Sequence, residues 1–239
     1  MDRYELIQNA KPILFNTEMV RAILDGRKTA TRRCVKPKSK NACGFYVTFR
    51  ESDNAFMGVY DYDENESMFE NSQTPPCQPG DILYVRETFK RNMDGYSGID
   101  FGGFIYKADC RSNFKDNYNP WRPSIHMPKE VARIFLKVTN VQVERLQDIT
   151  EEQALSEGVP DSLDYPISKV YCPRCHGNGL IGALGANLGY MEVDCQDCDT
   201  AIKRFKNLWD FTIKKSDLDR YGWDANPWVW VIEFERISI

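Results

Sequence analysis

Four cysteines stand in two CxxC pairs, Cys172-Pro173-Arg174-Cys175 and Cys195-Gln196-Asp197-Cys198, with 19 residues between the pairs. This is the spacing of structural zinc sites, in which each pair presents two thiolates to one tetrahedral ion. The Gly-rich stretch between the pairs has too little apolar content to hold its own shape, so a metal would replace the missing core. The sequence therefore predicts a structural Zn²⁺ ion bound by Cys172, Cys175, Cys195 and Cys198. Two redox-active dithiols are the alternative.

The other thiols carry no ligand pattern. His176 directly follows the first pair, and with four thiols available we expect it to be a neighbour rather than a ligand. No apolar run approaches the roughly 18 to 20 residues of a membrane span, and the N-terminal residues lack the apolar core of a signal peptide. A cytoplasmic protein without a membrane partner is the expectation. In that compartment we expect free, reduced thiols at Cys34, Cys43, Cys77 and Cys110.

Basic side chains gather near the N-terminus, although the chain carries a formal net charge of −4. Residues 1–50 contain 11 basic and 4 acidic side chains, whereas residues 51–81 contain 8 acidic side chains and no basic one. A concentrated basic patch can face nucleic-acid phosphates even in an acidic protein, and a solvated face is the simpler alternative. The cluster consists of Arg27, Lys28, Arg32, Arg33, Lys36, Lys38 and Lys40.

A second group of chemistry-bearing residues lies in the Pro-bracketed segment 121–128. Trp121 and His126 could stack a base while Arg122 contacts a phosphate, as in proteins that bind unpaired nucleotides. A Trp that plugs the end of a barrel is the alternative. Arg86 stands beside Glu87 at the end of an expected strand, where the pair would form the rim of a cleft or an ordinary surface ion pair.

Three helices are expected to position these residues. Thr17 as N-cap, followed by an apolar face, predicts a helix that ends at Gly26. Thr150 and Gln153 form a capping-box pattern at the start of a short helix that ends at Gly158. The third helix carries its apolar face on Ile202, Phe205, Leu208 and Trp209.

Alternating and β-branched runs predict strands separated by polar turns. The segment 131–146 is expected to form one long strand, or two strands separated by a bulge at Thr139-Asn140. Strands predominate, and closure into a barrel would remove the edges that many short strands expose. The other expected strands span 45–49, 56–60, 82–86, 104–107 and 228–234.

These elements predict an α+β fold, a small mixed β-barrel with flanking short helices, in a single domain over residues 1–239. Two insertions are expected in this domain. The first is an acidic, Pro-bounded segment over 51–80, expected to be an exposed hairpin plus loop. The second is the zinc ribbon over 165–200.

Several motifs together resemble the ASCH domain, which belongs to the PUA-like superfamily. They are Gly26-Arg27-Lys28-Thr29-Ala30-Thr31-Arg32-Arg33 after a helix, Gly80-Asp81 opening a strand, Glu157-Gly158 ending a short helix, and a last strand ending Val-Ile-Glu-Phe. The segments 12–15, 121–128 and 223–230 further resemble the longer ASCH proteins of phages and prophages. The resemblance covers essentially the whole chain, with the zinc ribbon as an insertion, and implies a PUA-like barrel.

The resemblance implies binding of RNA or of a nucleoside or nucleotide, with the basic run lining a cleft across the barrel. Some small ASCH proteins are instead amidohydrolases that deacetylate acetylcytidine with a Thr nucleophile, a Lys and a Glu. Those positions match Thr31, Lys28 and Glu157. Such a Thr needs a base to take its proton, and a partly desolvated Lys can be that base. The residues expected to contact nucleic acid are Arg27, Lys28, Arg32, Arg33, Arg86, Trp121, Arg122 and His126.

The same residues also allow structural interpretations. Thr31 could turn the chain into a strand, Lys28 could bind a phosphate, and Glu157 could form an ion pair with Arg33. The small amidohydrolases lack the acidic insertion, the 121–128 segment and the zinc ribbon, so the cleft entrance could be altered or covered here. A phage factor that binds a host protein through the ribbon and the acidic insertion is a third hypothesis.

Overall fold

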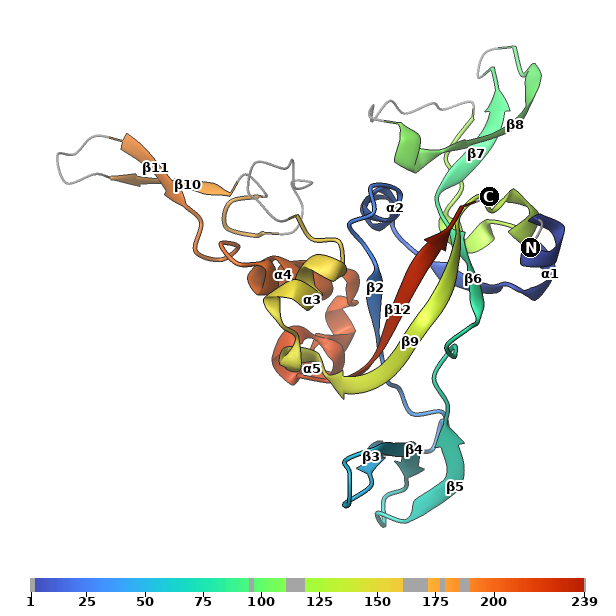
Figure 1. Ribbon diagram of the computed structural model, residues 1–239. Coiled ribbons are helices and arrows are strands. Elements are labelled where there is room, and N and C mark those ends of the chain that lie inside the picture. The colour runs from blue at the N-terminus through green and yellow to red at the C-terminus, as the bar shows by residue number, and fades with distance from the viewer. Residues whose placement is uncertain are drawn as a thin grey trace.

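The computed structural model describes residues 3–94, 97–110, 119–160, 172–176, 179–184 and 190–238. Its centre is a five-stranded mixed sheet in the order β1-β6-β9-β12-β2 (Figure 1). β1 runs parallel to β6, and the other neighbouring strands are antiparallel. The strands are β1 (Lys11–Leu14), β6 (Ile82–Arg86), β9 (Phe135–Arg145), β12 (Trp228–Ile237) and β2 (Ala30–Cys34).

The sheet is open between β1 and β2, its two edge strands. The predicted α+β class is confirmed, whereas the described strand pairings do not close the sheet into the predicted barrel. Both edge strands are short, with 4 and 5 residues, and a side chain rather than a backbone ladder connects them. Arg33 Nη2 donates to the Leu14 carbonyl oxygen at 2.8 Å. We call the gap between β1 and β2 the seam.

The second half of the basic run 26–33 is part of the sheet. Thr31, Arg32 and Arg33 lie in β2 and pair with Ile232, Val231 and Trp230 of β12. Because side chains alternate along a strand, Thr31 and Arg33 face one side of the sheet and Arg32 faces the other. The sequence missed this strand because its side chains are mostly charged or polar.

The helices that flank the seam begin with side-chain caps. α2 (Thr17–Leu24) is capped by Asn16, whose Oδ1 accepts from the Met19 backbone N–H at 2.9 Å, so the cap lies one residue before the predicted Thr17. α3 (Glu151–Ser156) has the predicted capping box of Thr150 and Gln153. It is followed by Gly158 with φ +89°, a conformation that favours glycine at a helix end.

The long strand β9 contains the predicted bulge. Asn140 pairs with Glu233 and Val138 pairs with Phe234, so Thr139 is an extra residue opposite β12. A bulge of this kind bends the strand and increases its twist. The bend contributes to the curvature of the central sheet in Figure 1.

The acidic segment is packed more closely than the sequence indicated. β3 (Gly44–Phe49), β4 (Phe56–Tyr62) and β5 (Met68–Gln73) form a three-stranded antiparallel sheet. Val59 is fully buried and Cys77 is 2% exposed, and both belong to the main core cluster. The rings of Phe49 and Phe56 lie 5.9 and 5.7 Å from the rings of Trp228 and Trp230, respectively. The predicted hairpin is therefore present and docks against the central sheet.

Alternation along β12 separates two cores. Trp230 and Ile232 pack into the main core, whereas Val229 and Val231 face a second core formed with α3 and α4 (Ala201–Thr212). α5 (Leu218–Tyr221) lies beside α4 in Figure 1. The predicted third helix is thus confirmed as a layer on one face of the sheet.

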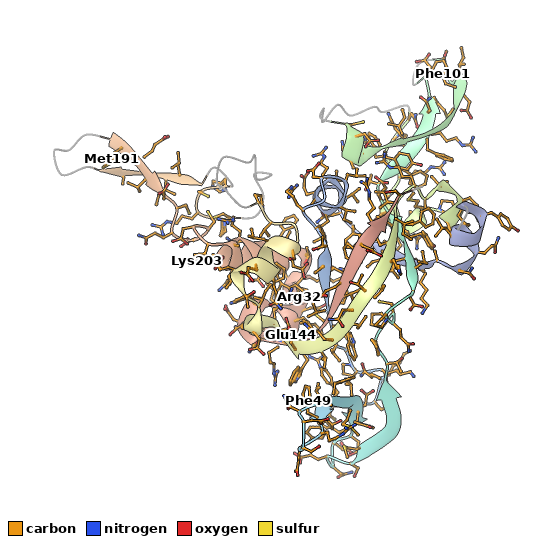
Figure 2. The ribbon with its side chains drawn as sticks, in the orientation of Figure 1. Arg32, Phe49, Phe101, Glu144, Met191 and Lys203 are labelled. Carbon is orange, nitrogen blue, oxygen red and sulfur yellow. The ribbon has the colours of Figure 1, made fainter. Side chains whose placement is uncertain are left out.

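Two hairpins extend from this body (Figures 1 and 2). They are β7 (Phe89–Met93) with β8 (Asp100–Tyr106), and β10 (Leu180–Leu184) with β11 (Tyr190–Asp194). α1 (Arg3–Asn9) buries Leu6 in a third cluster of buried residues, which includes Tyr84 of β6 and Phe135 of β9. In the described part of the chain, no helix is long and apolar enough to cross a membrane. Short 3₁₀-helices span Lys107–Asp109, Ser124–His126, Lys129–Val131, Leu146–Asp148, Lys215–Asp217 and Trp223–Ala225.

Candidate functional site

The four cysteines of the CxxC pairs converge on one point. Their Sγ atoms all lie within 4.8 Å of one another, and all four residues are buried. The Sγ atoms of Cys172 and Cys195 are 3.7 Å apart, and those of Cys175 and Cys198 are 3.5 Å apart. A tetrahedral ion with Zn–S bonds of about 2.3 Å places its sulfurs roughly 3.8 Å apart, whereas a disulfide needs about 2.05 Å. The cluster therefore has the dimensions of a metal site such as zinc.

The surroundings of the cluster fit a cation. Burial, with the neighbouring sulfurs, raises the pKa of the Cys198 thiol, and burial also raises the pKa of Cys195. A bound cation would favour the thiolate forms that this environment disfavours. The Gly179 backbone N–H donates to Cys175 Sγ at 3.3 Å, a contact typical of zinc knuckles. His176 is exposed and does not belong to the cluster.

The second CxxC pair is held by α4. Three side chains of the first two turns of this helix donate to backbone carbonyls of the knuckle, at 2.8 to 3.0 Å. Thr200 caps the helix directly after the knuckle, and Glu151 of α3 accepts from the backbone N–H of Ala201 at 2.7 Å. The three contacts are Lys203 to Gln196, Arg204 to Cys198 and Asn207 to Asp197. The metal centre and α4 are therefore one connected unit.

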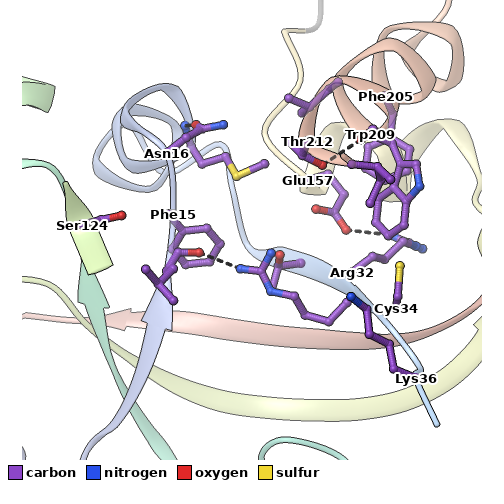
Figure 3. A pocket seen from close by; sticks show the side chains of 16 residues that line it. Phe15, Asn16, Arg32, Cys34, Lys36, Ser124, Glu157, Phe205, Trp209 and Thr212 are labelled. Atoms are coloured by element: carbon purple, nitrogen blue, oxygen red, sulfur yellow. Dashed lines mark hydrogen bonds and ion pairs between the residues drawn. The ribbon is translucent and has the colours of Figure 1, made fainter. Parts of the chain in front are cut away.

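The other face of α4 lines a pocket of about 460 Å³ at one end of the seam, which we call the seam pocket (Figure 3). One wall is the junction of β1 and α2, with Phe15 and Asn16. The opposite wall is α4, with Trp209 prominent in Figure 3. Glu157 lies between the two walls. The volume is in the range of pockets that hold one small organic ligand.

Glu157 is held by two buried cations. Lys28 Nζ donates to Glu157 Oε2 at 2.8 Å, and Arg32 Nη1 donates to Glu157 Oε1 at 3.1 Å. The side chains of Lys28 and Arg32 are fully buried, and that of Glu157 is 4% exposed. Arg32 is also paired with Glu144 at 2.6 Å. These four charges balance one another inside the protein.

The ammonium group of Lys28 has three acceptors. Besides Glu157 Oε2, it donates to the carbonyl oxygens of Ala30 at 2.7 Å and Glu157 at 2.8 Å. Burial lowers the pKa of Lys28, and the Glu157 carboxylate opposes this shift. Three acceptors match the three protons of an ammonium group, so this geometry describes the protonated lysine.

Thr31 is the remaining member of the predicted triad, and it lines the seam pocket together with Glu157. No residue of the described part of the chain forms a hydrogen bond with its hydroxyl group. The side chain is nonetheless almost completely buried, at 2% exposure. Because Thr31 lines the pocket, a ligand bound there could contact its hydroxyl group.

Several residues that were predicted to contact nucleic acid are instead engaged by other groups of the protein. Lys28 and Arg32 are neutralised inside the protein, and Arg27 donates to Gly158 O at 2.8 Å and pairs with Asp25. The expected ion pair of Glu157 with Arg33 is replaced by the pairs with Lys28 and Arg32. Two further cations, Arg33 and Lys36, line the seam pocket.

The segment 121–128 does not form one aromatic platform. Trp121 is half-buried, and the ammonium groups of Lys90 and Lys107 lie 5.0 and 4.9 Å from its ring. Arg122 is exposed and pairs with Phe89 in an isolated backbone bridge, and His126 is exposed in a 3₁₀-helix. Only Ser124 of this segment lines the seam pocket.

Arg86 and Glu87 do not form a rim pair. Arg86 donates to the carbonyl oxygen of Ile125. Glu87 is 1% exposed and accepts two hydrogen bonds from Arg133, at 2.8 and 3.0 Å. Arg133 also pairs with Asp109, so this group is a structural network away from the described pocket.

The sequence does not indicate the two walls of the seam pocket. Trp209 is a buried core residue, as expected, and Phe15 is buried in the main core, but both also line the pocket, which an aromatic residue in a core pattern does not reveal. The position of Phe15 directly before the Asn16 cap could have indicated its role, because it joins the end of a strand to the start of a helix. No protein-family model, no curated protein and no solved structure matches this chain, so its function must be argued from the pocket and the four-cysteine cluster.

Proposed function

We propose that the seam pocket binds a nucleotide, as part of RNA or as a free nucleoside phosphate. The observation that carries this proposal is Glu157, a carboxylate oriented by two buried cations and presented to a pocket with cations on its other side. Nucleotides combine a base with amino and ring donors and a phosphate with negative charge. The pocket offers an acceptor and cations at separate places, as such a ligand requires.

Glu157 suits the amino group of a base. Each carboxylate oxygen has about two acceptor positions, and the contacts with Lys28 and Arg32 use one on each oxygen. The remaining positions can accept from the exocyclic amino group of cytosine or adenine. Since both cations hold the carboxylate in place, little ordering is needed when the ligand binds.

Arg33 and Lys36 suit the phosphate. Arg33 uses one guanidinium nitrogen on Leu14 O and lies over the ring of Phe15 at 5.3 Å, which leaves further N–H donors. Lys36 is exposed and lies 4.8 Å from the ring of Tyr221. Both line the seam pocket, and neither has a carboxylate partner within the described residues.

The test is a titration with cytidine and uridine 5′-monophosphates at 50 and 200 mM salt. We expect the cytidine nucleotide to bind roughly tenfold more tightly, because uracil lacks the amino group that Glu157 would accept. Arg33→Ala and Lys36→Ala should weaken binding and reduce its salt dependence. Lys40→Ala, an exposed lysine outside the pocket lining, is the matched control. Equal affinities of all four proteins without salt dependence would exclude this function.

The resemblance to ASCH domains extends this proposal from the pocket to the fold. We propose that the open sheet is the PUA-like core of such a domain, and that the seam is the cleft that the resemblance places after the first long helix. Thr31, Arg32 and Arg33 of the basic run line the pocket at this seam, together with Glu157, which follows the short helix. We also propose Zn²⁺ as the occupant of the four-cysteine cluster, at one ion per chain. Metal analysis of Cys195→Ser, compared with Cys43→Ser, tests it, because only the first substitution removes a ligand.

A second candidate function is deacylation of an acylated base in the same pocket. The observation that favours it is that Thr31 and Glu157 line the same pocket and that Lys28 is paired with the Glu157 carboxylate. In this reaction, Thr31 Oγ attacks the acyl carbonyl carbon, its proton passes to the Lys28–Glu157 pair, and the base amine leaves with a proton. Water then hydrolyses the threonyl ester. Lys28 can accept a proton only after transferring one to Glu157, and its lowered pKa favours that transfer.

Incubation with acetylcytidine distinguishes the two functions. If the protein is an amidohydrolase, Thr31→Ala abolishes release of acetate and Thr31→Ser restores part of it. Thr29→Ala, an exposed threonine two residues earlier, is the control and should remain active. Binding of the nucleotide without release of acetate supports the first function alone.

A further inference from the structure

A second pocket continues the seam beyond the seam pocket. It has a volume of about 550 Å³, and we call it the distal pocket. It is lined by β1, by the end of β2, by Gln73 and Thr74 from the end of β5 and the residue after it, and by Trp230 of β12. Leu14, Arg33, Cys34 and Lys36 line both pockets. The two cavities are therefore neighbouring sections of one groove along the seam.

The groove exists because the sheet edges do not pair. β1 and β2 are at opposite ends of the strand order, and the hydrogen bond from Arg33 to Leu14 O crosses between them. Arg33 thus stands at the boundary of the two pockets. Its guanidinium group has donors left for a ligand that passes over it.

The charge of the distal pocket favours an anion. Its described lining includes the cations Lys11, Arg33 and Lys36, and no carboxylate. The nearest acidic groups of segment 51–81 have partners of their own. Asp81 pairs with Lys11 at 2.6 Å, and Asp61 accepts from the backbone of residues 38 and 39 and from Gln73. The acidic segment borders the groove without making its surface acidic.

We infer that the groove binds a single-stranded oligonucleotide of at least two nucleotides, with one base in the seam pocket and the next nucleotide in the distal pocket. The phosphodiester between them lies at Arg33 and Lys36, the residues that both pockets share. Lys11 contacts the next phosphate, and the apolar wall of Leu83, Trp230 and Ile232 faces the second base. This inference rests on the proposed nucleotide function and adds that a chain, rather than a mononucleotide, is the preferred ligand.

The experiment compares cytidine 5′-monophosphate with a cytidylate hexamer, in ribose and deoxyribose forms. We expect the hexamer to bind roughly tenfold or more tightly, because the second nucleotide binds as a linked group. Lys11→Gln should weaken hexamer binding and reduce the salt slope by about 0.7, without changing mononucleotide binding. Thr74 is exposed and lines the distal pocket, which a tryptophan there would fill. Thr74→Trp should therefore also weaken binding of the hexamer.

Lys137→Gln is the matched control. The side chains of Lys11 and Lys137 are both 52% exposed and each has one carboxylate partner, but Lys137 lines neither pocket. Equal affinities for the hexamer and the mononucleotide, or hexamer binding that is unaffected by both Lys11→Gln and Thr74→Trp, would overturn the inference while leaving the nucleotide function intact. If neither ligand binds, the proposed function itself fails. The ribose and deoxyribose arms show which nucleic acid the groove prefers.

Discussion

At the scale of single residues, the site depends on one carboxylate. Glu157 compensates two cations that have lost almost all contact with water, and an unpaired buried charge is among the most costly features that a fold can contain. The same carboxylate is presented to the seam pocket. Stability and ligand recognition therefore depend on the same side chain.

Replacing Glu157 with Gln is expected to destabilise the protein strongly. Lys28 loses its only carboxylate partner among the described residues, so the free energy of unfolding should fall by about 3–5 kcal/mol. Glu144→Gln is the control, because Glu144 is 17% exposed and Arg32 keeps Glu157 as a partner. Urea denaturation measures both variants. Equal and small losses would show that the buried pair contributes little.

The thiols near the groove should react slowly and with an unusual pH dependence. Burial raises the pKa of Cys34 and Cys77 from 9.0 to about 11. At pH 8 their thiolate fraction is about 100-fold lower than that of an ordinary thiol, so iodoacetamide should modify the exposed Cys43 first. The alkylation rate of Cys34, followed by peptide mass spectrometry, should still rise between pH 9 and 11. A plateau near pH 9 would contradict this environment.

The raised pKa values of Cys34 and Cys77 also determine how the stability of the fold changes with pH. Because the folded-state pKa lies above the unfolded value, the protonated thiols favour the folded state fully below pH 9. This contribution is lost as the pH rises through 11. Alkaline conditions should therefore loosen the seam at Cys34 and the packing of segment 51–80 at Cys77.

At the scale of elements, the sequence correctly predicted features that are determined by residues close together along the chain. The capping box at Thr150, the bulge at Thr139-Asn140, the strand 82–86 and the amphipathic α4 each depend on residues close together in sequence, and each is present. The edge strands β1 and β2 were missed. Their side chains lack alternation, and their positions follow from long-range pairing with β6 and β12.

Gly158 is predicted to be required by both its backbone and its neighbours. Its φ is +89°, and a Cβ there would lie 2.8 Å from Ala22 Cβ and 2.9 Å from Lys28 Cβ. We expect Gly158→Ala to cost about 2–4 kcal/mol, from backbone strain and overpacking together. Gly26→Ala isolates the strain, since Gly26 has φ +77° and no heavy atom within 4 Å of the same point. Similar denaturation midpoints for the two variants would contradict the close contact of α2, α3 and Lys28.

The connection between the metal centre and α4 predicts that metal removal affects the seam pocket. α4 binds the second knuckle with one face and lines the pocket with Phe205, Leu208 and Trp209. Chelation of the metal, or Cys198→Ser, should therefore weaken binding of cytidine 5′-monophosphate several-fold. Cys43→Ser should change neither the metal content nor the affinity. If the metal is lost and the affinity for the nucleotide is unchanged, the metal centre does not support the seam pocket.

At the scale of the whole molecule, charge segregation has a clearer meaning than the net charge of −4. The basic segment 1–50 supplies internal partners for Glu157 and Glu144 as well as the cations of the groove, and the acidic segment neutralises its own neighbours. The sequence predicted the presence of basic residues near a site. It could not predict which of them are buried, because that depends on α3, which follows more than 100 residues later.

The most direct measurement is the location of a bound oligonucleotide. A cytidylate hexamer with one 5-iodocytidine, which keeps the amino group of cytosine, is cross-linked by light and mapped by peptide mass spectrometry to show which residues lie against its bases. We expect cross-links to the β1–α2 junction near Phe15, to α4 near Trp209 and, from a neighbouring position of the hexamer, to Thr74 or Trp230. Cross-links confined to the β7–β8 or β10–β11 hairpin, with none along the seam, would contradict it.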